Sequence, residues 1–450
     1  MSTHPSNDEN LGRFTYAEVD RDILATLGTP GKGYLALLLL CLGLVALGAF
    51  SWTYLVLKGI GVTGLNNAVG WGSLITNFVF WVGIGHAGTL ISAILYLLRA
   101  SWRTAIFRAA EAATIFAVAT AGLFPLIHIG RLWVAFYLMP YPNGRQLWPN
   151  FRSPLVWDVL AVSTYLTVSA IFFFVGLIPD IAAVRDRQKP GPVKWILSIA
   201  SLGWMGTMLQ WKHYMAAYVL FAGLATPLVI SVHSVVSWDF AMSVIPGWHT
   251  TIFAPYFVAG AILSGLAMVI TILVPLRKVF RIEHIIRPFH FESMAKLLLF
   301  TSLIVGYAYA TEFFIAWYSG NPFETSVFVY RPTGDHAVAF WTMVVCNAVI
   351  PLLIFRSRIR KSLGALFVIS LFVNLGMWFE RFNIIVTSLG HAYMPSRWGS
   401  YTMSLTEWGI MLGSFGWFFL LFLSFIRLLP AVSIAEMKEA MPAPAKGATS

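Results

Sequence analysis

Three titratable side chains stand in apolar stretches that have the character of membrane spans. His128 lies in the stretch LFPLIHIGRLW, three residues before Arg131 and just after Pro125. Asp158 lies about one turn into the run that begins SPLVWDVLAV, and Asp239 follows the apolar run that ends in VHSVVSW. A charged side chain at the centre of a bilayer costs about 2.5–3.5 kcal/mol on insertion scales, so such residues are rare and mark sites or proton relays. Imidazole and carboxylate groups together suit proton transfer.

The direction of each apolar run places these groups at one depth. His128 and Arg131 fall in the outer third of an outward-running span, Asp158 starts the next span, and Asp239 ends the one after. We therefore expect a cluster near the outer face, with His128 and Arg131 on one helix face because they are three residues apart. A buried aspartate can also merely hold helices together, and an arginine near a helix end can snorkel. The matched depth of all three favours a functional cluster.

Two loop residues and a second, scattered group complete the candidates. His249, in IPGWHTTIFAPYF, and Arg397, in YMPSRWGSY, lie in loops on the outer side, near the cluster. Five further ionisable residues lie within or at the ends of the spans and could be stepping stones for protons: His86, Glu111, His233, Glu312 and Glu380. Each of these five could equally be a satisfied core group.

Ten apolar stretches have the length of about 20 residues that a spanning helix needs. They are 33–57, 74–98, 104–139, 154–178, 213–238, 252–277, 293–318, 336–356, 362–386 and 404–428. The chain is 58% hydrophobic and only 11% charged, against roughly 25% charged residues in soluble domains. We therefore expect an all-α integral membrane protein. The short apolar stretch 195–209 is expected to be an interfacial helix.

Lysine and arginine alternate in density from loop to loop. With both tails counted on the dense side, that side holds 23 of the 30 basic residues. By the positive-inside rule, the N-terminal segment 1–32 and the C-terminal tail 429–450 are expected in the cytoplasm, around a spanning domain at 33–428. The net charge of +11 is then a matter of topology, which argues against a nucleic-acid partner.

A weak internal echo recurs at an offset of four helices. In the third span His128 lies five residues before Trp133, and in the seventh span Glu312 lies five residues before Trp317. An even offset predicts a parallel pseudo-repeat, with helices 2–5 and 6–9 forming two four-helix bundles and helices 1 and 10 flanking them.

The cysteines and histidines limit the redox cofactors of the chain. Cys41 and Cys346 are its only cysteines, so a cysteine-ligated iron–sulfur cluster within the chain is excluded, and no CxxCH motif for covalent haem exists. A b-type cytochrome needs paired histidines on facing helices. His86 is expected at mid-membrane and His128 and His233 nearer the outside, so depth-matched pairs at both leaflets are not expected. No metal site is predicted.

Four segments carry a resemblance to a known family: HIGR, WDVLAVSTYL, GLATPLVISVHSVVSWDFAMSVIPGWHTTIFAPYFVAGA and EFFIAWYSGN. They are similar to the NrfD/polysulfide-reductase membrane subunits and, within that family, to the ActC subunits that oxidise quinol in bacterial alternative complex III. The likeness covers about 33–428. It implies two four-helix bundles and a quinol site near the outer, periplasmic face. The family's site residues map onto His128, Asp158 and Asp239, with Arg397 as an addition; Arg131 and His249 are expected to line the same site.

The resemblance also implies partners and a location. The chain would be the membrane subunit of a respiratory or photosynthetic quinol:electron-acceptor oxidoreductase in the bacterial cytoplasmic membrane, with menaquinol as the expected substrate. Electrons would leave to an iron–sulfur subunit, ferredoxin-like or of the molybdopterin type, and to a multihaem c-type cytochrome on the outer face. An NrfD-like paralogue would lie beside it in the membrane, and proton translocation could accompany the reaction.

Roles for the cluster follow from quinol chemistry. We expect His128 to accept the proton of one quinol hydroxyl, with Asp158 orienting His128 or receiving that proton. Asp239 would accept the proton of the second hydroxyl or lie on the exit route by which protons reach the outer loops. Arg131 would keep the carboxylates ionised, and Pro125 would bend its helix and open the pocket.

Two other functions remain open on the sequence. A non-redox ion or proton transporter would suit the repeats and the buried charges, although no pair of helices is obviously broken at mid-membrane. The second alternative is a paralogue that has the same fold but no working quinol site, like the ActF subunits of the same complexes.

Overall fold

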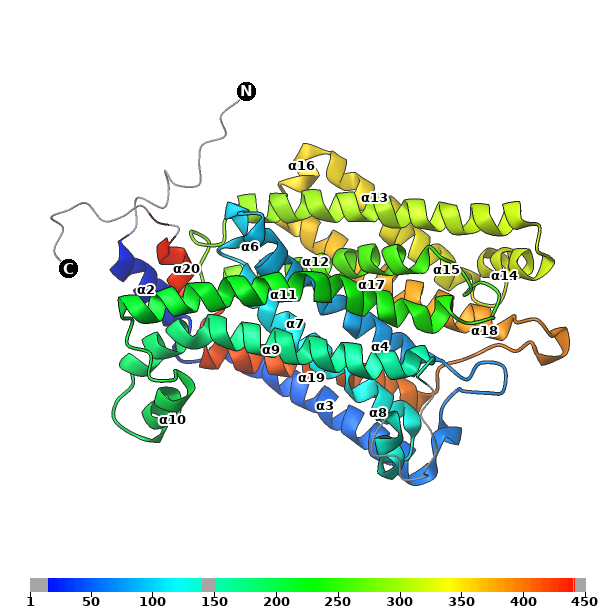
Figure 1. Ribbon diagram of the computed structural model, residues 1–450, viewed down its shortest axis with the longest axis horizontal. Helices are drawn as coiled ribbons and strands as arrows, with labels where there is room; N and C mark the ends of the chain where they lie inside the picture. The colour runs from blue at the N-terminus through cyan, green and yellow to red at the C-terminus, as the bar shows by residue number, and fades with distance from the viewer. Residues whose placement is uncertain (1–14, 140–150, 440, 442–450) are drawn as a thin grey trace.

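The computed structural model describes residues 15–139, 151–439 and 441, so parts of the expected terminal segments lie outside the described residues (Figure 1). Over this part the chain forms helices and no strand, and nine helical segments are long and apolar enough to cross a membrane. They are α3 (Lys32–Lys58), α7 with α8 (Phe107–Ala121, Leu123–Ile129), α9 (Pro154–Asp186), α11 (Met208–Ala241), α12 (Phe253–Val279), α13 (Pro288–Ser319), α15 with η5 and η6 (Ala337–Val344, Val345–Val349, Ile350–Phe355), α17 with η7 and α18 (Leu363–Phe382, Asn383–Thr387, Ser388–Gly390) and α19 (Leu405–Leu428). The predicted fold class is confirmed.

The stretch expected as the second span, 74–98, is helical in consecutive short pieces. These are α4 (Ser73–Ile84), α5 (His86–Thr89), the π-helical segment η2 (Leu90–Ile94) and α6 (Leu95–Leu97). The segments η5 and η7 are also π-helical. These π-helical segments lie within continuous helical stretches, and π-helical turns often occur at functional sites.

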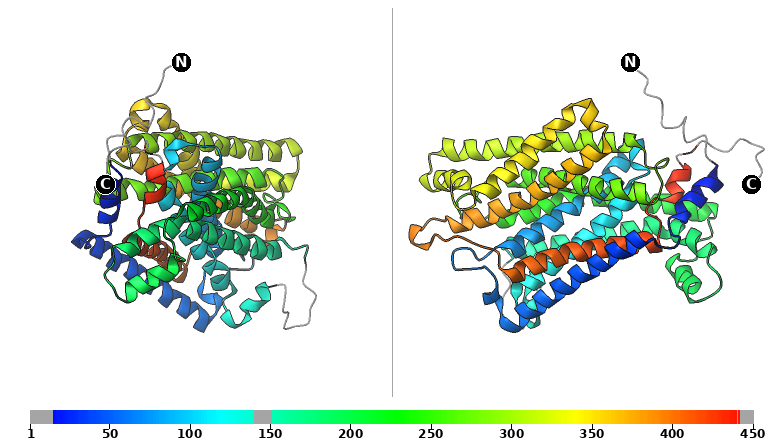
Figure 2. Two further views of the ribbon diagram at one scale, coloured as in Figure 1. Left: turned by 60° about the vertical axis from the view of Figure 1, so that its left-hand side comes forward. Right: turned by 180° about the vertical axis from the view of Figure 1, so that it is seen from behind.

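The helices form two four-helix bundles with a flanking pair (Figure 2). Bundle 1 consists of the α4–α6 stretch, α7 with α8, α9 and α11; bundle 2 consists of α12, α13, the α15–η6 stretch and α17 with its continuation. The bundles meet where α12 and α17 pack against α4, and α12 against α11. Helices α3 and α19 run side by side and α19 packs on α7. This is the arrangement that the four-helix offset predicted.

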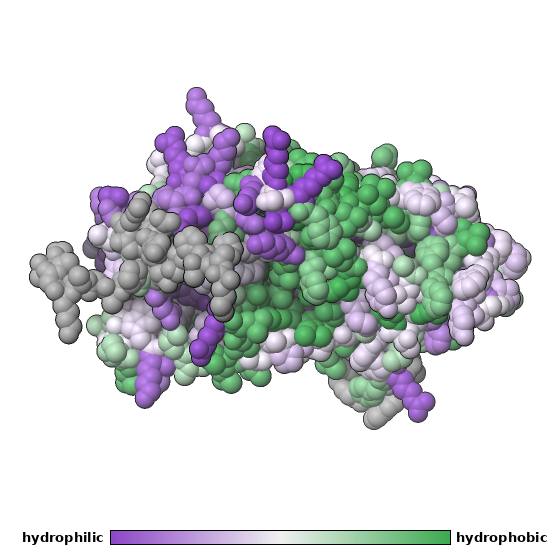
Figure 3. Space-filling view, turned by 90° about the horizontal axis from the view of Figure 1, so that it is seen from above, coloured by the Kyte–Doolittle hydropathy of each residue, from purple (hydrophilic) through white to green (hydrophobic). Residues whose placement is uncertain are grey.

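The two ends of the molecule differ. Helices α2 (Tyr16–Ala25), α10 (Pro192–Ala200) and α20 (Ile434–Glu439) gather at one end, named here the α20 end. Helix α14 (Pro322–Thr333) and the short helix η8 (Pro395–Arg397) lie at the opposite, α14 end. Figure 3 shows hydrophilic side chains gathered toward the α20 end and an apolar belt across the middle. The short helix expected at 195–209 is α10, with no buried residue, but it ends at Ala200; residues 201–207 are not helical and Met208 begins α11.

The third span ends sooner than expected. Its helix breaks at Gly122, because Pro125 has no N–H for the Ala121 carbonyl, and it stops at Ile129. Gly130, with a φ of +72°, turns the chain out of the helix. Residues 132–138 then form a 3-10 helix, η4 (Leu132–Leu138), instead of continuing the span to residue 139.

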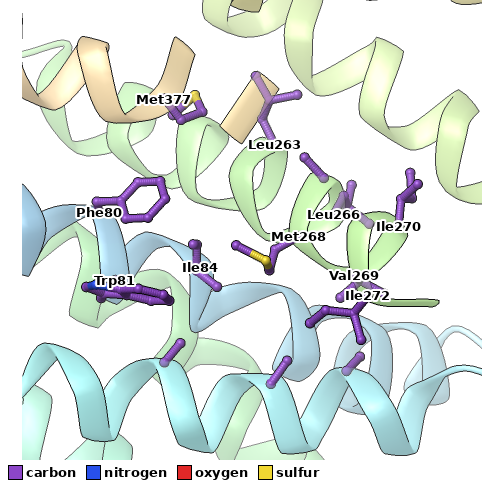
Figure 4. Packing of buried hydrophobic residues seen from close by; sticks show 14 of the residues in the cluster. Phe80, Trp81, Ile84, Leu263, Leu266, Met268, Val269, Ile270, Ile272 and Met377 are labelled. Atoms are coloured by element: carbon purple, nitrogen blue, oxygen red, sulfur yellow. The ribbon is translucent and has the colours of Figure 1, made fainter. Parts of the chain in front are cut away.

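The core lies between the bundles, where α4 meets α12. Trp81 and Leu263 are fully buried there, and Figure 4 shows them with Phe80, Ile84 and Met377 around the same contact. Apolar packing of this kind gives the bundle contact its rigidity, so polar groups at the same level are held in fixed positions.

Helices α3 and α19 approach each other through glycines. A Cβ atom on Gly48 would lie 2.7 Å from the Cα of Gly413, closer than two carbon atoms can pack. In membranes, small residues allow this close backbone contact, which supplies packing where the hydrophobic effect between helices is absent.

We expect Gly48→Val to lower the thermal midpoint of the purified protein, because an added side chain costs about 1–3 kcal/mol by overpacking. The matched control is Gly43→Val on the same helix, where nothing lies within 4 Å of an added Cβ. Equal midpoints for the two variants in a melting experiment would contradict the close contact.

Candidate functional site

Asp158 and Asp239 form a pair at the α14 end of bundle 1. Asp158 lies one turn into α9 and Asp239 two residues before the end of the neighbouring α11. Their carboxyl groups are close enough to hydrogen-bond each other, which requires one shared proton because a carboxylate has no donor. Trp157 and Trp238 pack edge to face beside them, with ring centroids 5.8 Å apart. One oxygen of each carboxyl is buried without a hydrogen-bond partner.

His128 lies at the same end of bundle 1. Val118, Tyr165 and Val232 pack in one cluster across α7, α9 and α11. At about 1.5 Å per residue, His128 and Asp158 lie roughly 15 and 10 Å outward from that cluster. His128 is partly buried and its Nδ1 has no hydrogen-bond partner. All three residues thus lie outward of this cluster in bundle 1, although in the described chain no hydrogen bond joins His128 to either aspartate.

In the described residues, none of the other three expected site residues hydrogen-bonds to the pair. Arg131 and His128 do not share a helix face, because α8 ends at Ile129 and Gly130 redirects the backbone; this expectation was wrong. Arg131 is exposed, and Arg397 is exposed in η8. His249 is exposed, with its Nδ1 3.0 Å from the Ser243 carbonyl oxygen.

His86 and His233 are in contact in the middle of bundle 1. Their ring centroids are 4.5 Å apart in an edge-to-face arrangement, so the different depths expected from the sequence were wrong. The rings touch each other, which differs from a ligand pair held on opposite sides of a haem iron. His86 stacks on Tyr165, whose hydroxyl lies 2.8 Å from the Thr89 hydroxyl. Both ring nitrogens of His233 lack a hydrogen-bond partner.

A buried ion network closes the α20 end of bundle 1. The fully buried Arg108 donates to Glu111 (2.9 Å), to Asp180 (3.2 Å) and to the Gly176 carbonyl (2.7 Å). Sequence reasoning named Glu111 and missed its partners. The signal was present, because opposite charges three residues apart in an apolar helix predict an ion pair.

The C-terminal helix α20 completes that network. The backbone N–H of Ile434 donates to Asp180 over 3.0 Å, and Glu436 pairs with Arg103 over 2.6 Å. Burial raises the pKa of the Glu436 carboxyl, while Arg103 lowers it. No feature of the apolar pattern indicated that the tail returns to the bundle.

Glu312 and Glu380 belong to bundle 2, so the five proposed stepping stones divide between two networks. Glu380 pairs with Arg381 at 2.5 Å and accepts a hydrogen bond from Tyr309, whose hydroxyl also accepts one from Asn347 at 2.9 Å. Glu312 lies 4.0 Å from the nearest guanidinium nitrogen of Arg331.

Within the described ranges, no group of three or more histidine, cysteine, aspartate or glutamate residues is arranged to hold a metal ion. The buried polar groups of the two bundles combine carboxyl, imidazole and hydroxyl groups.

Known proteins share this chain's sequence over both bundles. Residues 61–391 match the family described as polysulphide reductase, NrfD. A Halobacterium salinarum protein, named as a putative membrane subunit of dimethyl sulfoxide reductase, is 28% identical over 376 residues, which are 82% of this chain and 79% of that protein. The Hdr-like menaquinol oxidoreductase integral membrane subunit of Archaeoglobus fulgidus is 21% identical over 429 residues, or 90% of this chain and 96% of that subunit.

The family match spans the aspartate pair, His128 and the contacting histidines, and it ends at the residue that follows α18. This agrees with the resemblance of the four quoted segments, and this chain therefore belongs to the NrfD/polysulphide reductase family.

Proposed function

We propose that this chain is the quinol-binding membrane subunit of an oxidoreductase and that quinol is oxidised at the Asp158–Asp239 pair. The observation that carries the proposal is the pair itself, two adjacent carboxyl groups with one unpartnered oxygen each. Support comes from a relative over most of the chain that is named as a menaquinol oxidoreductase subunit, so menaquinol is the proposed substrate.

Oxidation of a hydroquinone gives a quinone, two protons and two electrons. In the proposed reaction the unpartnered oxygens of Asp158 and Asp239 accept hydrogen bonds from a quinol hydroxyl, and the pair takes up its proton. His128 receives the second proton through its free Nδ1. Both electrons pass to an iron–sulfur or haem c subunit bound at the α14 end, since the chain itself offers no cysteine set for a cluster.

The orientation in the membrane follows from charge. Hydrophilic side chains gather toward the α20 end, and the sequence places Lys and Arg densely in the loops of that side, as in 185–194 and 277–287. By the positive-inside rule we therefore infer that the α20 end faces the cytoplasm. The α14 end is then the periplasmic face. Exposed aromatic residues on it, such as Trp133, Tyr393 and Trp398, suit docking of the electron-accepting subunit. We propose an assembly like alternative complex III, in which a second NrfD-like subunit lies beside this chain in the membrane.

Bundle 1 also offers a proton route from the cytoplasmic end. His233 lies six residues before Asp239 on α11 and contacts His86. Glu111 lies in the ion network nearer the α20 end, with one oxygen buried and unpartnered. Together these groups form a series of proton-holding side chains along bundle 1, and we propose that they carry protons toward the quinol site.

We expect Asp158→Asn to lower quinol turnover by about 10²–10⁴-fold, the range for loss of a general base, with assembly unchanged on a native gel. Asp186→Asn is the matched control, because Asp186 ends the same helix with a side chain that is 64% exposed. Wild-type turnover in an assembled Asp158→Asn complex would refute the assignment.

We expect Glu111→Gln to lower the number of protons released per quinol in proteoliposomes toward the two that quinol itself supplies, while turnover continues. The physical reason is that an amide cannot carry the proton that Glu111 passes on. Glu283→Gln, an exposed carboxyl on a loop, controls for charge loss. An unchanged proton ratio in the working Glu111→Gln complex would exclude this route.

A further inference from the structure

Two adjoining cavities lie at the α14 end, between the end of α11, the start of α12 and the end of α13. They share His249, Thr250 and Ile315, and together they are named here the Glu312 cavity. The larger part, of about 400 Å³, is mainly apolar, with Trp238 and Met242 in its wall. The wall of the smaller part, of about 220 Å³, is also mainly apolar, but it contains the following polar side chains: Glu312, Glu324, Thr250, Ser319 and Asn321.

Glu312 lines the smaller part of this cavity, and one oxygen of its carboxyl group has no hydrogen-bond partner. Its residue is only 6% exposed and its Oε1 has no hydrogen-bond partner. The nearest cation, Arg331, lies 4.0 Å from that oxygen, beyond hydrogen-bonding distance. Arg331 donates instead to the Gly247 carbonyl at 3.1 Å and to the Ser388 hydroxyl at 3.2 Å. Buried carboxylate oxygens are almost always hydrogen-bonded, so this one needs a donor.

Glu324 adds a second carboxyl group to the lining of the same cavity. One of its oxygens accepts the Gly247 N–H over 2.7 Å. Burial raises the pKa of the Glu324 carboxyl, against the lowering effect of that N–H and of the charges on Arg331 and His249. His249, expected at the aspartate pair, lies on this cavity, where its side chain reaches Glu324 electrostatically.

The side chains that line the Glu312 cavity indicate which class of ligand it would bind. The two carboxyl groups repel a phosphate head group and accept hydrogen bonds from neutral hydroxyls. The apolar part takes a flat ring system or the first units of a prenyl chain. The combined volume is in the range of small-molecule sites, roughly 300–1,000 Å³. A hydroquinone matches both parts, since it is an apolar ring that carries hydroxyl donors at its edge.

We propose that the Glu312 cavity is a second hydroquinone-binding site in this chain, separate from the Asp158–Asp239 pair. Neither aspartate is among the residues that line it. Glu312 and His128 lie on corresponding elements of the two bundles, because α13 and α7 with α8 are each the second helix of their bundle and both residues lie in the last two turns of that helix. The identity of the ligand rests on the proposed function; the cavity and its unpartnered carboxylate do not.

The test is the number of hydroquinone molecules bound per chain. The assembled protein in lipid nanodiscs is titrated with a short-chain naphthohydroquinone under reducing conditions, and bound ligand is counted at equilibrium. We expect two per chain in the wild type, one in Asp158→Asn, one in Glu312→Gln and none in the double variant. Glu292→Gln, on the same helix α13 but near the α20 end, is the matched control, and we expect it to bind two hydroquinone molecules like the wild type.

Each outcome separates the two proposals. One ligand per wild-type chain, removed by Asp158→Asn and kept by Glu312→Gln, would overturn the second site and leave the first. One ligand removed by Glu312→Gln alone would support the Glu312 site and overturn the assignment at the aspartate pair. Ala254→Trp, which fills the apolar part of the cavity, must remove the same ligand as Glu312→Gln; if it does not, the second site is refuted even where Glu312→Gln folds poorly.

Discussion

The need to pair every buried charge shapes the interior of both bundles. A buried ion that loses its partner costs about 3–5 kcal/mol, and the fully buried Arg108 is accordingly held by two carboxylates and a carbonyl. Arg381 pairs with Glu380 in bundle 2. Asp158 and Glu312 each keep one buried oxygen without a hydrogen-bond partner, and both are among the acceptors assigned above to quinol binding.

The large features of this protein follow from its apolar pattern. The length of the apolar runs and the alternation of basic loops predicted the spans. A weak similarity between spans four apart, such as His128–Trp133 and Glu312–Trp317, predicted two bundles, because the number and order of helices decide which of them can pack together. Depth counting also brought Asp158 and Asp239 to one level, where they are paired. Where a helix is regular, counting residues along it is sufficient to predict the depth of a side chain.

The failures of prediction occur where helices are irregular or contacts are distant in sequence. Gly130 takes Arg131 off the helix face of His128, and a spacing of three residues means nothing once the helix has ended. The π-helical segment η2 begins four residues after His86, and the histidine contacts His233 at a level that straight-helix counting did not give. The pairing of Glu436 with Arg103 joins residues that are 333 positions apart, and no local pattern encodes such a contact.

The return of α20 to bundle 1 has a consequence for biosynthesis. All four helices of bundle 1 are complete by Ala241, yet Asp180 and Arg103 receive their partners from Ile434 and Glu436. A chain is made and inserted from its N-terminus. Asp180 and Arg103 are therefore without these partners while the ribosome adds the whole of bundle 2 and the last span. Helix α20, which is made after the last span, therefore completes the first bundle to enter the membrane, and a chain that lacks α20 leaves the charged groups of Arg103 and Asp180 without these partners.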